Sequence, residues 1–139
     1  MMTNFIYDEF HPDPIYDNTR TATEECINYI LQKSTMEWMH NFQSDNLRLN
    51  AKFPLTAEQL KETVNNFKAA YDDLRIDNIS SAECTVNGND SRVSGSYSIS
   101  LNAGIRNYTV SGNWDVYLER DQDLGYWYIN NVQITGIDF

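Results

Sequence analysis

The sequence predicts an α+β domain in which an antiparallel sheet packs against two helices. Three observations predict it. From about residue 74 onward, the chain alternates apolar and polar residues in long runs, as strands with one buried face do. Before that, two segments carry apolar residues at helical spacing, and each begins with a capping sequence. A length of 139 residues with 41% hydrophobic residues suits one core, and therefore one domain.

Charge and composition exclude several classes of partner. Ten Lys and Arg against twenty Asp and Glu give a net charge of -10, which repels nucleic acid. We expect no membrane span, because no apolar run approaches about 20 residues. The N-terminus lacks the basic start and apolar centre of a leader. The doubled Met is nevertheless compatible with removal of an upstream leader or anchor, so a cytoplasmic and an extracytoplasmic location both stay open.

The first 20 residues carry Pro12, Pro14 and many acids without a sustained period, which predicts an extended arm. A single domain is expected to follow at 21–139. The alternative interpretation of the arm is a partly ordered tail. Its aromatic residues are candidates for contact with a partner: Phe5, Tyr7, Phe10 and Tyr16.

The sequence TATE predicts the start of a first helix, because Thr21 and Glu24 can form a capping box. A kink is expected at 33–35, and the helix is expected to continue to Phe42. Its apolar face repeats at close to 3.6 residues. That face comprises Cys26, Ile27, Ile30, Leu31, Ser34, Trp38 and Phe42.

A short strand and a second helix are predicted next. Thr56 and Gln59 form another capping box, which opens the clearest helix in the chain. The strand is closed by Pro54 and alternates Leu47, Leu49, Ala51 and Phe53. The helix presents one stripe, Ala57, Leu60, Val64, Phe67, Tyr71 and Leu74, which must cover an apolar surface.

The rest of the chain is expected to form a four-strand meander. Asn87 and Gly88 are predicted to supply the positive φ angles of a two-residue hairpin. A one-residue change of phase predicts a bulge near Asn130 and Asn131. Strict alternation gives the inward positions of the four strands in turn: Leu74, Ile76, Asn78, Ser80, Ala82, Cys84 and Val86; Val93, Gly95, Tyr97, Ile99 and Leu101; Tyr108, Val110, Gly112, Trp114, Val116 and Leu118; Trp127, Ile129, Val132 and Ile134.

This order of elements, closed by the aromatic, aliphatic and bulge pattern of YWYINNV, resembles the nuclear-transport-factor-2-like (cystatin-like, cone-shaped) superfamily over about residues 21 to 137. The resemblance implies a strongly bent antiparallel sheet, a meander plus a short strand, wrapped around two N-terminal helices. That superfamily includes ketosteroid isomerases and polyketide cyclases as well as transport factors and assembly proteins without activity. Fold alone does not choose between them.

The inward strand positions favour a non-catalytic function. None of them is Asp, Glu, His, Lys or Arg, so the strands supply no general base. Helix carboxylates could supply one but are typically solvated: Glu24, Glu25, Glu37, Asp45, Glu62, Asp72 and Asp73. His40 and His11 are further minor candidates. Cys26 and Cys84 lack metal spacing and are expected to be free thiols. Neither a metal site nor a cofactor is expected, because DQDLG lacks the remaining ligands of a calcium loop.

We therefore expect a binding or assembly domain whose partner is another protein, in an envelope or secretion assembly for example. The alternatives are an enzyme resembling polyketide cyclases or ketosteroid isomerases, or a carrier of an apolar small molecule. In both alternatives the ligand would lie among Trp38, Tyr97, Tyr108 and Trp114. The outer sheet face is too polar for a large apolar dimer interface, so a monomer or a weak polar homodimer is expected.

Overall fold

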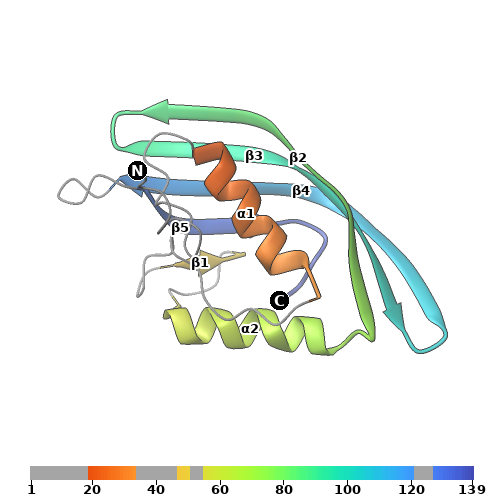
Figure 1. The fold of residues 1–139 in the computed structure, drawn as a ribbon. Coiled ribbons are helices and arrows are strands. Elements are labelled where there is room, and N and C mark those ends of the chain that lie inside the picture. Colours follow the sequence, from red (N-terminus) through yellow and green to blue (C-terminus); the bar gives the residue numbers. More distant parts are fainter. Residues whose placement is uncertain (1–18, 34–46, 51–54, 121–126) are drawn as a thin grey trace, which may run out of the picture.

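The computed structural model describes residues 19–33, 47–50, 55–120 and 127–139, which form two helices beside one curved sheet (Figure 1). In chain order the elements are α1 (Thr19–Leu31), β1 (Arg48–Leu49), α2 (Ala57–Ala69), β2 (Asp73–Asn87), β3 (Asp90–Ala103), β4 (Arg106–Arg120) and β5 (Trp127–Ile134). The strand order is β1-β5-β4-β3-β2. The four long strands pair in antiparallel fashion, as predicted. β1 instead pairs in parallel with β5, so the sheet is mixed.

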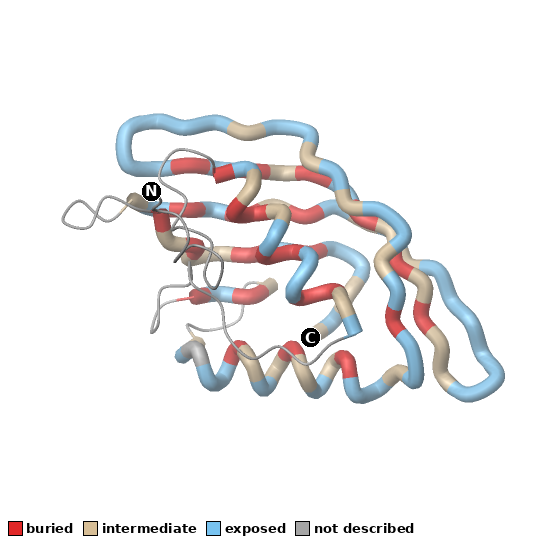
Figure 2. Tube along the Cα trace, viewed as in Figure 1, coloured by how far each residue is buried: buried red, intermediate tan, exposed pale blue. Residues whose placement is uncertain are grey.

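Both helices lie on the inner, concave side of the sheet (Figure 1). Buried and exposed residues alternate along β3 and the second half of β4, as expected for strands with one face on the core (Figure 2). The core joins α1, α2 and the inner face of the sheet, and it includes Ile27, Ile30, Leu60, Val64, Ile99, Trp114, Val116, Trp127 and Ile129.

Both helix predictions are confirmed in part: the capping box of α2 is present, but α2 ends at Ala69, so Tyr71 and Leu74 of its predicted stripe lie beyond the helix. In α2, the Gln59 amide donates to Thr56 Oγ1 over 3.1 Å, and the Thr56 amide donates to Gln59 Oε1 over 3.0 Å. α1 begins at Thr19, so Thr21 lies inside its first turn and the predicted capping box is wrong. The helix also ends at Leu31, before the expected kink. Its predicted apolar residues Cys26, Ile27, Ile30 and Leu31 are buried, whereas Ser34, Trp38 and Phe42 lie outside the described residues.

The strict alternation predicted for β2 is wrong between its two bulges, from Asn78 to Ala82. The β2–β3 register shifts twice, between Ile76 and Asn78 and between Ser81 and Glu83. Each bulge adds one residue and reverses the phase of the residues after it. The predicted inward residues Asn78, Ser80 and Ala82 are therefore exposed, and the second bulge restores the predicted phase at Cys84. Val86 follows in the predicted inward phase, but it lies near the end of the strand and is 54% exposed. The residues of β2 that are buried or half-buried are Leu74, Ile76, Ile79, Ser81 and Cys84.

The bulge predicted in β5 is confirmed. Tyr117 pairs with Asn131 and Leu118 pairs with Ile129, which leaves Asn130 without a partner in the ladder. The β2–β3 hairpin is present, but its turn residues are 88 and 89, because Asn87 pairs with Asp90. Only Gly88 has a positive φ there, 64°, so the expectation of a positive φ at Asn87 is wrong. Gly at the first turn position fits the type II′ pattern.

Two glycines on the inner face allow aromatic rings to lie directly on the sheet. Gly95 pairs with Trp114 across β3 and β4, and Gly112 pairs with Tyr97 on the same two strands. A Cβ atom on Gly95 would lie 2.1 Å from the Ser80 carbonyl oxygen, and one on Gly112 would lie 2.6 Å from the Thr135 carbonyl oxygen. No side chain fits at either position without a backbone shift. Glycines in curved sheets commonly mark such bends.

Candidate functional site

The four residues predicted to line an apolar pocket do not form one group. Tyr97 and Trp114 are 2% and 1% exposed and fill the core. The Tyr97 hydroxyl donates to the Thr135 carbonyl over 2.5 Å, and Trp114 Nε1 donates to the Ser96 carbonyl over 3.0 Å. Tyr108 lies further along the sheet, opposite Leu101, and is 40% exposed. Trp38 lies outside the described residues.

The other residues predicted as candidates for contact or catalysis also lie partly inside and partly outside the described residues. The arm residues Phe5, Tyr7, Phe10 and Tyr16 lie outside the described residues, as do His11, Glu37, His40 and Asp45. Among the described residues, the inner face of the strands carries no carboxylate, His or Lys. At the two ends of β4 the inward phase does reach Arg106 and Arg120, which sequence reasoning overlooked. The Arg120 guanidinium lies 4.7 Å from the centre of the Trp127 ring.

A groove between α1 and β2 brings two helix carboxylates close to the inner face. It has a volume of about 340 Å³ and is lined by Thr21, Glu24, Glu25, Asn28 and Ile79. The Ser81 hydroxyl donates to Glu24 Oε2 over 2.5 Å, so Glu24 is held against the sheet. Partial burial raises the pKa of the Glu25 carboxyl above its ordinary value. The shift of phase in β2, which placed Ile79 and Ser81 inward, could not be read from the sequence.

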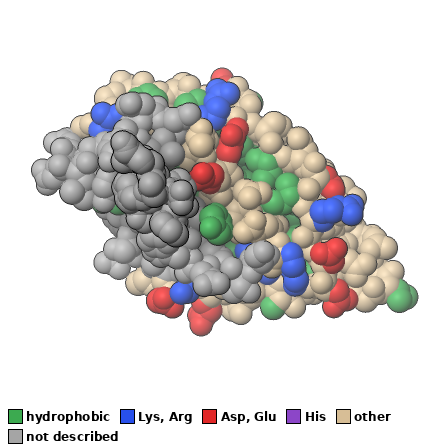
Figure 3. All heavy atoms as spheres, viewed as in Figure 1, with side chains coloured by type: hydrophobic (Ala, Val, Ile, Leu, Met, Phe, Trp, Pro, Cys, Tyr) green, Lys and Arg blue, Asp and Glu red, His purple; other side chains and the backbone are tan. Residues whose placement is uncertain are grey.

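The far end of the β2–β3–β4 layer carries an apolar surface that the helices leave partly uncovered. The hairpin between β3 and β4 projects beyond α2 in Figure 1. Its tip residue Ile105 is 99% exposed. On the inner face of the same layer, Ile76 and Val110 are half-buried opposite Ile99, and Tyr108 is exposed. We call Ile76, Ile105, Tyr108 and Val110 the distal patch. Hydrophobic side chains are also visible on this part of the molecule in Figure 3.

The hairpin tip is held in place by its neighbours. The Gly104 amide donates to Asp72 Oδ2 over 2.7 Å, which ties the tip to the segment between α2 and β2. Gly104 has a φ of 65°, so the turn uses the conformation that glycine adopts readily. Asn102 Nδ2 donates to Asn107 Oδ1 over 2.6 Å across the base of the hairpin. Ile105 is therefore presented on a defined turn, which lowers the ordering cost of any contact it makes.

Two lysines connect the C-terminal ends of the helices. Lys68, on α2, is 3% exposed and donates from Nζ to the Tyr29 carbonyl of α1 over 2.8 Å. Lys33, just beyond α1, donates to the carbonyls of Lys68 and Tyr71 over 3.0 and 2.6 Å. Each ammonium thus meets carbonyls at the negative end of the other helix. Burial, followed by repulsion from Lys33, lowers the pKa of Lys68 to about 8.

The cysteines and acids offer little further chemistry. Both cysteines are free; Cys26 is fully buried, and burial raises the pKa of its thiol, which disfavours the reactive thiolate. Cys84 lies 3.3 Å from Thr19 Oγ1. In the described part of the chain, no three His, Cys, Asp or Glu residues gather as a metal site would require. Within the same part, no helix combines the length and apolar character of a membrane-spanning helix.

Comparison with known proteins gives the fold. No family profile matches the chain, and no curated protein matches it. Several solved structures do match the chain. A nuclear transport factor 2 superfamily protein from Salmonella enterica superposes with a TM-score of 0.64 at 12% identity, over 86% of this chain and 88% of that one. The chain has the nuclear-transport-factor-2-like fold.

Two further structures with similar architecture support this assignment. The Kfla4162 protein from Kribbella flavida has a TM-score of 0.64 at 12% identity, over 85% of this chain and 87% of that one. A nuclear-transport-factor-2-like protein of unknown function in nutrient uptake, from Rhodospirillum rubrum, has a TM-score of 0.57 at 11% identity, over 88% of this chain and all of that one (100%). At these identities the nuclear-transport-factor-2-like fold is shared, and activity does not follow from it.

Proposed function

We propose that this nuclear-transport-factor-2-like domain is a non-catalytic module that binds another protein through the distal patch, as part of a larger assembly such as one in the cell envelope or a secretion system. The observation that carries the proposal is the 99% exposed Ile105 on an anchored hairpin beside partly exposed apolar residues. Apolar anchors on rigid elements supply most of the binding energy at protein interfaces. The partner would offer an apolar pocket for Ile105.

The inner face of the described strands supports the same proposal. It carries aliphatic and aromatic residues that pack together, and Tyr97 and Trp114 use their polar atoms in bonds to backbone carbonyls. A general base on these strands would need a carboxylate or His, and none is present among their described inward residues. The aromatic residues of the N-terminal arm, Phe5, Tyr7, Phe10 and Tyr16, are proposed as a second contact element.

A photoreactive benzoylphenylalanine at position 105, introduced in the source organism, tests the proposal. We expect one cross-linked product of defined mass, which disappears when excess wild-type domain is added but persists when the added domain carries Ile105→Asp. That substitution should leave the melting temperature unchanged, because the side chain has almost no protein contacts.

Position 86 provides the matched control, since Val86 is an exposed apolar residue of β2 outside the distal patch. The same probe there should give no such product. Equal products at positions 105 and 86, or none at 105, would contradict the proposal. A product with the mass of two copies of this chain would show that the distal patch contacts a second copy of the chain and not another protein.

A second candidate function is small-molecule chemistry in the groove between α1 and β2. Its support is the raised pKa of Glu25 beside a space of about 340 Å³. Carboxyls with a raised pKa cluster at functional sites, where they can act as proton donors. Against this function, Glu25 is largely exposed and Glu24 is already bonded to Ser81. A carrier of an apolar ligand would also need walls more apolar than Thr21, Asn28 and the two carboxylates provide.

A further inference from the structure

The outer face of β3 and β4, opposite the helices, is covered by short polar side chains in register. Across the two strands the pairs are Ser94 with Asp115, Ser96 with Asn113, Ser98 with Ser111 and Ser100 with Thr109. We call these eight residues the polar track. The Ser94 and Ser96 hydroxyls make no hydrogen bond to any described side chain, and the Ser98–Ser111 bond is long, at 3.5 Å. Much of the hydrogen-bonding capacity of the track therefore faces outward.

Two ion pairs lie beside the polar track. At one end, Arg92 donates to both carboxylate oxygens of Asp115, over 2.9 and 2.6 Å. At the other end, Arg75 lies 3.3 Å from Asp77, and the Ser100 hydroxyl donates to the same Asp77 carboxylate. The same face also carries four carboxylates outside these ion pairs, Asp73, Glu83, Asp90 and Glu119, so it is acidic, like the chain as a whole with its net charge of -10. This acidic face would repel an anionic ligand but not a neutral one.

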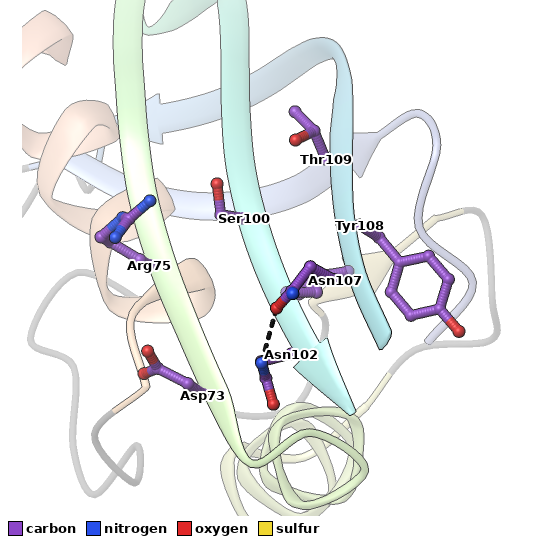
Figure 4. A pocket seen from close by; sticks show the side chains of 8 residues that line it. Asp73, Arg75, Ser100, Asn102, Asn107, Tyr108 and Thr109 are labelled. Atoms are coloured by element: carbon purple, nitrogen blue, oxygen red, sulfur yellow. Dashed lines mark hydrogen bonds between the residues drawn. The ribbon is translucent and has the colours of Figure 1, made fainter. Parts of the chain in front are cut away.

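A depression lies at each end of the polar track. The first, about 240 Å³, is bordered by Asp73 and Arg75 of β2, Ser100 and Asn102 of β3, and Asn107 and Thr109 of β4 (Figure 4). The ring of Tyr108, which also borders it, points away from the other side chains in that view. The second, about 310 Å³, is lined by Ala82, Ser94, Gly95, Asn113, Trp114, Asp115, Gln133 and Thr135. Ser94 and Asn102 are eight positions apart on β3, which is about 26 Å at the usual rise of a strand.

The lining has the chemistry of a surface for neutral hydroxyl groups. Carboxylates accept, guanidinium groups donate, and carboxamides and hydroxyls do both. A hydroxyl group needs a donor and an acceptor at close spacing, and each depression supplies both. A protein partner would instead require apolar anchors at its centre. Among the described residues, Tyr117, 39% exposed and stacked under Arg92 at 5.4 Å, is the only large apolar side chain exposed on this face.

We propose that the polar track binds a neutral oligosaccharide chain, which lies along β3 and places sugar rings in the two depressions. The track lies on the outer face of the sheet, whereas the distal patch lies on the inner face and the hairpin tip. The oligosaccharide site therefore adds a ligand to the proposed protein contact and does not depend on it.

Affinity electrophoresis in native gels tests the proposal, with soluble neutral polysaccharides as probes: a β-glucan, an α-glucan, a xylan and a mannan. We expect at least one of them to retard the wild-type domain, with little change on adding salt, because the contacts are between neutral groups. The anionic polysaccharide polygalacturonate should not retard it. The double variant Ser96→Lys/Ser98→Lys should bind the retarding polysaccharide at least tenfold more weakly, because two long side chains then cover the track.

The control is the double variant Asn66→Lys/Ala69→Lys, which adds the same charge to exposed positions of α2 and should keep the retardation. No retardation by any of the four neutral probes, retardation by polygalacturonate alone, or equal retardation of both double variants would overturn the proposal. So would a wild-type dimer that the Ser96→Lys/Ser98→Lys variant dissociates, since the track would then be a contact between two copies. None of these results would alter the cross-linking expected at position 105.

Discussion

Replacement of Trp114 by alanine is expected to lower the free energy of unfolding by about 3 to 5 kcal/mol, enough to unfold a marginally stable domain. The indole is 1% exposed, lies against Gly95 and donates to the Ser96 carbonyl. Its removal would leave a cavity that the strands cannot close, because the glycine beneath it has no side chain to move into the space. The hydrogen bond from the indole to the Ser96 carbonyl would also be lost.

Chemical denaturation followed by circular dichroism measures this change. Tyr117→Ala provides the control, since Tyr117 is an aromatic residue of the same strand on the opposite face and is 39% exposed. We expect it to cost less than about 1 kcal/mol. If Trp114→Ala lowered the free energy of unfolding no more than Tyr117→Ala, the assignment of the two faces of β4 would be wrong.

The second large effect is expected at Lys68. Its pKa of about 8 in the folded protein lies below its ordinary value of 10.5, so folding disfavours the charged form. Between these two values the unfolded chain binds more protons than the folded one, and stability must rise with pH. Relative to Lys68→Met, which lacks the ionisable group, the wild type should gain about 2 to 3 kcal/mol between pH 7 and pH 10.

Urea unfolding of both proteins at pH 7 and pH 10 gives this difference. Other groups that titrate in the same range, such as tyrosines, are common to both proteins and cancel. An unchanged difference between the two pH values would mean that the Lys68 ammonium is as well stabilised in the folded protein as in water. Lys33→Met is a useful companion, because Lys33 lowers the pKa of Lys68 by repulsion. In a protein that carries Lys33→Met, the gain in stability that Lys68 causes between pH 7 and pH 10 should be smaller.

The sequence predicted the order of elements because most of the strands follow simple periodicities. β3 alternates over its whole buried length, and the change of phase in β5 was visible because aromatic and aliphatic residues mark both sides of the bulge. The bulges of β2 were not visible. Ser, Ala and Asn occupy the positions where its phase reverses, and none of them has enough hydrophobic character to reveal which face is buried.

The candidate sites depend on contacts between segments far apart in the chain, and this is why sequence reasoning found them only in part. The distal patch exists because the β3–β4 hairpin extends beyond both helices, which depends on helix length and packing. The depressions of the outer face combine residues from three or four strands. Lys68 was not singled out, because a lysine on a helix is usually solvated. Its burial follows from the meeting of two helix ends.

Binding of the neutral dye Nile red, measured by fluorescence between pH 5 and pH 8, tests most directly whether apolar ligands bind at the distal patch without help from a titrating group. We expect the dissociation constant for the dye to change less than twofold over this range, since the distal patch contains no group that titrates there. The constant should rise in Ile105→Asp. It should be unaffected by Glu25→Gln or His40→Gln. A clear midpoint in this range, present in His40→Gln and absent from Glu25→Gln, would place the binding site in the groove between α1 and β2 and contradict the account.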